Sequence, residues 1–221
     1  MENKMALMSV IVSVLFFNLS VLALPQDVFQ KPSYKLYTRA DWQAKPATDI
    51  VPLKAPVPYV VIHHTYIPAA CHSFNECSTD MRGMQNYHIG LDFGDIGYNF
   101  CVGSEGGAYE GRGWDLRGIH AGRANNHSIG ICLIGDWREE LPPQPQLETT
   151  KALIADGVRL GKVSPDYKLI GHNQVMATAC PGTALSEEIS TWEHFTNAKP
   201  DFNLLKDVIT ATEGTEEVTT E

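Results

Sequence analysis

The sequence predicts a single α/β domain, with a central mixed β-sheet flanked by helices. Segments with the apolar or alternating character of strands take turns along the chain with segments of helical periodicity. Between an apolar start and an acidic end, the chain is long enough for one domain with a sizeable core. We expect this domain to occupy residues 35–198, and no internal repeat is visible in it.

Residues 1–23 have the pattern of a secretory signal peptide. Lys4 supplies the positive start, Met5 to Leu22 is almost wholly apolar, and Val21-Leu22-Ala23 ends in small residues that suit signal peptidase. The apolar run approaches transmembrane length, so an uncleaved anchor is the alternative. The lack of charge directly after it favours cleavage. We therefore expect a secreted protein without membrane contact once the signal is removed.

The first strand is expected at 59–65, an apolar run that ends in polar residues. A loop follows, and then a helix from about 79 to 89, because Met81, Met84 and His88 recur on one helical face.

The middle of the chain predicts three further strands. Residues 97–103 and 108–111 are typical of a hairpin, joined by a glycine-rich turn at 104–107. Residues 128–135 are almost all apolar, which indicates a strand that is buried on both faces.

The last predicted elements are a helix, a strand and a short helix. The helix is expected at 146–160, where apolar residues are spaced for one face, followed by a strand at 167–171 and a helix at 183–192.

Both ends of the chain lie outside the predicted domain, as an N-terminal arm at 24–34 and an acidic, disordered tail at 199–221. The formal net charge is −9, and residues 207–221 carry five acids without a lysine or arginine. Such a tail has little to bury. An acidic chain without a basic run is a poor candidate for binding nucleic acid or anionic membranes.

Five cysteines in a secreted chain leave at least one outside any disulfide. Cys71 and Cys77 are close together in a polar loop, so we expect a short bridge between them. Cys101 and Cys132 lie in strand-like runs, where they either pair across neighbouring strands or stay buried thiols. Cys180 is then left over.

A histidine and this leftover cysteine suggest a metal site. His172 and Cys180 are good zinc ligands, and Pro181-Gly182 places the cysteine on a turn. The end of the first strand offers a third ligand, but only one of His63 and His64 can face a given site, because strand residues alternate faces. Three protein ligands leave a fourth position for water, as in catalytic zinc sites. The alternative is a buried cysteine and an ordinary loop histidine.

Six motifs occur in an order that carries a family resemblance. They are Val61–Thr65, Asp95–Phe100, Tyr109–Trp114, Gly118–Gly122, Ser128–Ile131 and Gly171–Gly182. Together they resemble the peptidoglycan recognition proteins, animal relatives of the phage zinc amidases that cut bacterial cell wall. The likeness runs from about Leu36 to Phe195, and the run Leu133–Pro143 is most similar to catalytic insect members.

The resemblance implies roles for individual residues. It makes His63, His172 and Cys180 the zinc ligands, and so selects His63 over His64. Tyr98 matches the family's active-site tyrosine, and Thr178 lies where phage enzymes carry a lysine and catalytic animal members often carry threonine.

The resemblance also matches the short Cys71–Cys77 bridge, and it implies a groove. Its predicted substrate contacts are His64, His88, Trp114, His120, Arg123 and Asn126. Without the resemblance, His64 and His88 are structural histidines, and the remaining four are surface loop residues. Asn126-His127-Ser128 is also a glycosylation acceptor.

Three arginines form the one basic cluster that the sequence shows in this acidic domain. They are Arg112, Arg117 and Arg123. Because arginine binds carboxylates through a bidentate fork, one of them is predicted to read the extra carboxylate of diaminopimelic acid. The alternative is that all three are ordinary solvated charges.

The resulting hypothesis is a secreted, monomeric zinc amidase of innate immunity. It binds bacterial peptidoglycan, hydrolyses the bond between the lactyl group of N-acetylmuramic acid and L-alanine, and scavenges the immune signal. The alternative is a receptor that binds wall fragments without cutting them. The family's non-catalytic members typically lack the ligand at Cys180, so its presence favours the enzyme. A cysteine protease built on Cys180 and His172 ranks third, because nothing in the sequence activates the thiol.

Overall fold

The structure is a computed structural model that describes residues 33–200 and residue 202. The predicted signal peptide, residues 24–32 of the arm, and the acidic tail at residue 201 and from 203 onward lie outside the described residues. Within the described part, no helix has both the length and the apolar character needed to cross a membrane.

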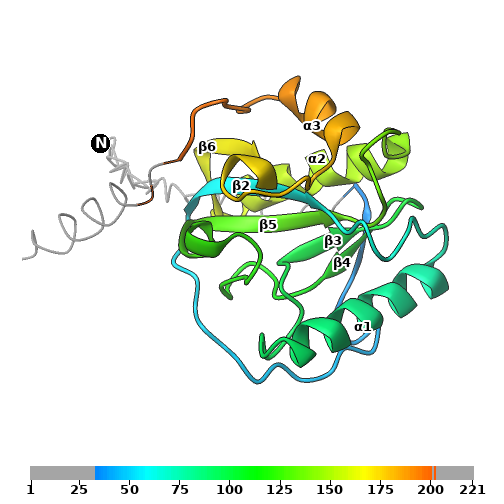
Figure 1. The fold of residues 1–221 in the computed structure, drawn as a ribbon. Coiled ribbons are helices and arrows are strands. Elements are labelled where there is room, and N and C mark those ends of the chain that lie inside the picture. Colours follow the sequence, from blue (N-terminus) through cyan, green and yellow to red (C-terminus); the bar gives the residue numbers. More distant parts are fainter. Residues whose placement is uncertain (1–32, 201, 203–221) are drawn as a thin grey trace, which may run out of the picture. The chain divides into compact units, whose positions relative to one another are not determined.

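The centre of the fold is a six-stranded mixed sheet in the order β1-β4-β3-β5-β2-β6 (Figure 1). Its strands are β1 (Lys35–Tyr37), β2 (Val57–His64), β3 (Phe100–Val102), β4 (Gly107–Glu110), β5 (Ser128–Leu133) and β6 (Val163–Gly171). Neighbouring strands run parallel except for β3 and β4, which form the antiparallel hairpin that the glycine turn predicted.

Helices cover both faces of this sheet, as Figure 1 shows. They are α1 (Phe74–Gly90), α2 (Gln144–Arg159) and α3 (Thr183–Ser190). Apolar residues of α2 and α3 share one core cluster with Val60 and Ile62 of β2. Residues of α1 pack in a second cluster with Cys101, Tyr109 and Cys132 on the other face. The predicted α/β class with a helix-flanked mixed sheet is therefore confirmed.

The first helix begins at Phe74 rather than at Thr79. The Ser73 hydroxyl caps it by accepting a 3.3 Å hydrogen bond from the Glu76 backbone N–H. Serine followed three residues later by glutamate is a known start signal, so the sequence contained the information. Cys77 consequently lies in the helix. The sequence analysis had placed it in a loop.

Further differences concern short elements. Strand β1 and the 3₁₀-helices η2 (Gly122–His127) and η3 (His172–Gln174) were not predicted. Phe202, assigned to the tail, packs edge-on against Tyr59 and stacks on His127, so ordered packing extends beyond residue 198.

Two disulfides are present among the described residues, Cys71–Cys77 and Cys101–Cys132. The first was predicted. The second joins β3 to β5 at positions that are direct partners in the parallel register, which decides between the two alternatives left open above. Cys180 stays a free thiol, as expected.

Candidate metal centre

The three predicted zinc ligands meet at one end of the sheet. His63 lies near the end of β2, His172 follows directly after β6, and Cys180 lies in the loop before α3. Strands β2 and β6 are parallel neighbours, so their carboxyl ends share an edge. One ligand atom from each of the three residues lies within 4.8 Å of the others.

Their spacing fits a zinc ion. The Cys180 Sγ atom is 3.8 Å from His63 Nδ1. Tetrahedral zinc with ordinary bond lengths separates a sulfur and a nitrogen ligand by about 3.6 Å. The backbone N–H of His64 also points at Cys180 Sγ, at 3.3 Å, and such a donor stabilises a thiolate. The donor set and its geometry therefore suit the metal.

Each of the two histidines in this cluster uses its Nε2 atom for a contact within the protein. His63 Nε2 lies 3.0 Å from Nδ1 of His120, and His172 Nε2 lies 3.2 Å from the Met176 sulfur. Nδ1 is then the nitrogen of each ring that is left for a metal.

Burial keeps these side chains uncharged in the metal-free protein. It lowers the pKa of His172 to about 4 and that of His120 to about 3, and it holds the pKa of His63 well below its usual range. It also raises the pKa of the Cys180 thiol to about 12. Neutral imidazoles are ready to coordinate, whereas the thiol must lose its proton when a metal binds.

The metal-free protein should therefore lose stability as the pH falls. Unfolded histidines accept protons near pH 6.5. The folded protein accepts them on His172 and His120 only near pH 4 and 3. Across that window the unfolded chain binds more protons, so the folded state is destabilised. The melting temperature of chelator-treated protein should drop by about 5 °C or more between pH 7 and pH 5. An unchanged melting temperature would contradict the buried, neutral state.

Tyr98 stands beside the ligand cluster. Its ring centroid is 5.3 Å from that of His63, and burial raises the pKa of its phenol, with Cys180 as a second cause. The hydroxyl is therefore a neutral hydrogen-bond donor at neutral pH. Thr178 lies on the loop before Cys180, and its hydroxyl accepts a 3.2 Å hydrogen bond from the Cys180 backbone N–H.

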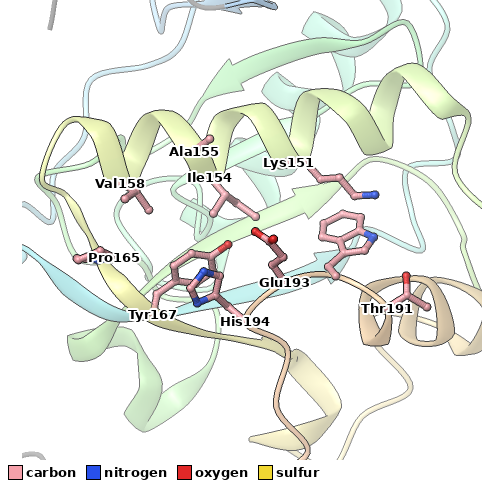
Figure 2. Close-up of a pocket in the computed structure, with 10 residues that line it drawn as sticks. Lys151, Ile154, Ala155, Val158, Pro165, Tyr167, Thr191, Glu193 and His194 are labelled. Carbon is pink, nitrogen blue, oxygen red and sulfur yellow. The ribbon is translucent and has the colours of Figure 1, made fainter. Parts of the chain in front are cut away.

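A cavity of about 380 Å³ opens onto this cluster. It is lined by His64, Thr65, Tyr66, Tyr98, Arg138, His172, Thr178, Ala179 and Cys180. A larger cavity of about 540 Å³ lies between α2 and the segment after α3 (Figure 2). Tyr167 and His194 stack in it and Lys151 approaches the Trp192 ring, but it contains none of the predicted site residues.

Comparison with known proteins identifies the family. The family model described as "N-acetylmuramoyl-L-alanine amidase" matches residues 53–183. Peptidoglycan-recognition protein LB of Drosophila melanogaster is 48% identical over 164 residues, which cover 74% of this chain and 71% of that protein. The chain belongs to the peptidoglycan recognition protein family.

Two further matches extend this comparison. The N-acetylmuramoyl-L-alanine amidase of Mus musculus is 40% identical over 168 residues, covering 74% of this chain but only 32% of the mouse protein. A solved structure of a Tyr-to-Phe mutant of Drosophila PGRP-LB in complex with tracheal cytotoxin superimposes with a TM-score of 0.72 and 48% identity. It covers 73% of this chain and 96% of that one.

Within this member of the peptidoglycan recognition protein family, the predicted groove residues fall into different environments. His64 is 5% exposed and its Nδ1 accepts a 3.2 Å hydrogen bond from the Trp137 backbone N–H. It faces the α2 side of β2, since it alternates with His63. His88 packs against Tyr98, stacks on Phe93, and accepts a hydrogen bond from the Gly97 N–H. These contacts are the kind that structural histidines make, but His64 also lines the cavity at the ligand cluster, so its substrate contact stays a prediction.

The prediction for Trp114 was wrong about where its ring lies. The ring packs against Phe100, 4.4 Å between centroids, and against Gly157 of α2, where an added Cβ would lie 2.8 Å from it. Trp114 is therefore half-buried against the core cluster on the α2 face and does not lie on the face that carries His63.

Arg112 is likewise structural. It is 4% exposed, and its guanidinium donates hydrogen bonds to the backbone carbonyls of Ile96, Phe93, Asp49 and Arg117. It cannot read a substrate carboxylate from there. Arg123 and Asn126, on η2, are exposed, and Arg123 lines a cavity of about 580 Å³ with Lys199.

Sequence reasoning missed two residues at the mouth of the metal cavity. The Arg138 guanidinium lies over the Tyr66 ring at 4.6 Å and forks onto the Asp136 carboxylate, the shortest contact being 2.7 Å. Tyr66 has a φ of 60°, an uncommon conformation for a bulky residue. The Asp136-x-Arg138 pair was visible in the sequence only as part of a family motif.

Proposed function

We propose that this protein is a zinc-dependent N-acetylmuramoyl-L-alanine amidase, which hydrolyses the amide between the lactyl group of N-acetylmuramic acid and L-alanine of the stem peptide. The observation that carries the proposal is the convergence of His63, His172 and Cys180 beside Tyr98. The description of the family model supports the reaction. The complex of the Drosophila relative with tracheal cytotoxin supports peptidoglycan fragments as the ligand.

Three of the residues would bind the metal, one would contact the substrate, and one positions the ligand loop. His63, His172 and Cys180 would hold zinc, which in a three-ligand site activates a water molecule and polarises the carbonyl. The neutral Tyr98 phenol donates a hydrogen bond toward the carbonyl oxygen as negative charge develops there. Thr178 fixes the loop that presents Cys180, through the hydrogen bond to its backbone N–H.

We further propose that the protein acts outside the cell, as a monomer that removes immunostimulatory wall fragments. The signal-like segment 1–23 supports secretion. Among the three clustered arginines, burial removes Arg112 as a reader of diaminopimelic acid and leaves the half-buried Arg117 and the exposed Arg123 as candidates.

Mass spectrometry of a defined muropeptide incubated with the purified protein and zinc tests the reaction. We expect release of the intact stem peptide, which locates the broken bond. An unchanged muropeptide, with protein that holds one zinc ion, would instead support the receptor that binds without cutting.

Replacing Tyr98 with phenylalanine tests the proposed role of the phenol. The rate of hydrolysis should fall about 10²- to 10³-fold, the usual effect of losing one such donor. The ring still packs against His63 and His88, so zinc content should stay unchanged. Full activity in this variant would exclude the Tyr98 hydroxyl from catalysis.

A further inference from the structure

We propose that His120 is a positioning residue for the metal centre, because it accepts a hydrogen bond from His63 and so holds the tautomer that presents Nδ1 to the metal. This inference rests on the zinc binding in the proposed function. It gives His120 a different role from the substrate contact that the sequence predicted.

The two imidazoles form a close and enclosed pair. His63 Nε2 and His120 Nδ1 are 3.0 Å apart, and the rings stand at 87° with 5.0 Å between centroids. His63 is 1% and His120 8% exposed, so bulk water does not compete for this hydrogen bond.

A hydrogen bond between two neutral imidazoles has one donor and one acceptor. If His63 donates from Nε2, its Nδ1 keeps a lone pair, and that atom lies 3.8 Å from Cys180 Sγ. If His120 donated instead, His63 would carry its proton on Nδ1, directed at the metal position. Only the first arrangement lets His63 coordinate.

The fold holds His120 in place from both sides. The backbone N–H groups of His120 and Ala121 donate to the Asn125 side-chain oxygen, at 3.0 and 2.7 Å. The ring lies against Gly118 and Gly130, where an added Cβ at either position would collide with it. The two glycines therefore leave the space that the imidazole fills.

The second ring nitrogen of His120 is not available for contact with a substrate at the surface. Its Nε2 atom is buried and has no hydrogen-bond partner among the described residues. With Nδ1 as acceptor, Nε2 must carry the proton. The side chain thus works through His63 and offers no exposed polar atom to a substrate.

The Nε2 atom of His172 faces a much weaker hydrogen-bond acceptor than that of His63. His172 Nε2 faces the sulfur of Met176, a thioether that is a weak acceptor and belongs to a 46% exposed side chain. The chain therefore supplies a comparison: removing the acceptor from His63 should matter more than removing it from His172.

Two variants of similar size separate the hydrogen bond from packing. In His120→Asn, the side-chain oxygen occupies a position close to that of Nδ1 and can accept, whereas His120→Leu fills the space without an acceptor. We expect the dissociation constant for zinc, measured by chelator competition, to rise about 10- to 100-fold in His120→Leu. It should change less than about threefold in His120→Asn and in Met176→Leu.

The tautomer itself can be read directly. Nitrogen-15 NMR of the metal-free wild-type protein should show His63 protonated on Nε2, and this needs no variant to fold. A proton on Nδ1 of His63 would overturn the proposal, as would a folded His120→Leu protein that binds zinc as tightly as wild type.

These readouts are independent of hydrolysis. A wild-type protein that binds zinc but does not cut muropeptide overturns the proposed amidase and not the role of His120. An active wild-type enzyme whose His120→Leu variant keeps its zinc affinity overturns the role of His120 alone.

Discussion

Replacing Cys180 with serine is expected to abolish zinc binding and to lower the rate of muropeptide hydrolysis roughly 10³-fold or more. A bound metal supplies several kcal/mol of transition-state stabilisation, and each 1.36 kcal/mol is tenfold in rate. The sulfur lies 3.8 Å from His63 Nδ1, within reach of a shared ion. A serine hydroxyl is neutral at pH 7 and a poor zinc ligand, so two histidines remain, which is one ligand fewer than catalytic zinc sites use.

Metal analysis and hydrolysis should be measured on the same preparation of this variant. The Tyr98→Phe protein is the matched control, because it should lose activity while it keeps zinc. The melting temperature of both variants without metal should resemble that of wild type, since Cys180 lies on a loop. A Cys180→Ser protein with one bound zinc and wild-type turnover would show that the sulfur is not a ligand.

Removing the Cys101–Cys132 disulfide by a double replacement with alanine should destabilise the protein by about 4 kcal/mol. The Cys71–Cys77 pair should cost only about 2 kcal/mol, because the loop-entropy estimate grows with the length of chain that a bridge closes. The two bridges span 31 and 6 residues. All four cysteines are buried, so the alanine cavities are comparable and the difference reflects the bridges.

Urea unfolding without reductant measures both losses, with each double variant compared to the wild type. Similar losses for the two pairs, or a larger loss for Cys71–Cys77, would contradict the expectation. In that case the short bridge would stabilise the start of α1 by more than its loop length suggests.

The sequence predicted the layout of the sheet and helices because those depend on local patterns. Apolar runs marked β2 and β5, and the glycine turn marked the hairpin of β3 and β4. The end of α1 was predicted within a residue, and its start was missed although the capping signal at Ser73 was present.

Long-range packing decided what the local pattern could not. Alternation showed that one of His63 and His64 must face away, but which one depends on the face that α2 covers. The ring of Trp114 turns to the core because Gly157 of α2 leaves room for it. The Cys101–Cys132 bond depends on the register of β3 and β5. His120 was predicted at the site, but its buried contact with His63 was not.

The separation of the ligands along the chain links metal binding to folding. His63 and Cys180 are 117 residues apart in sequence, and they meet only when β2 pairs with β6. A fragment or a partly folded chain without that pairing has no site, so the unfolded ensemble binds zinc weakly. A zinc ion bound as proposed would then add stability to the complete fold, in proportion to the logarithm of its concentration. Under the proposed function, zinc occupancy of the purified protein would therefore report that β2 has paired with β6.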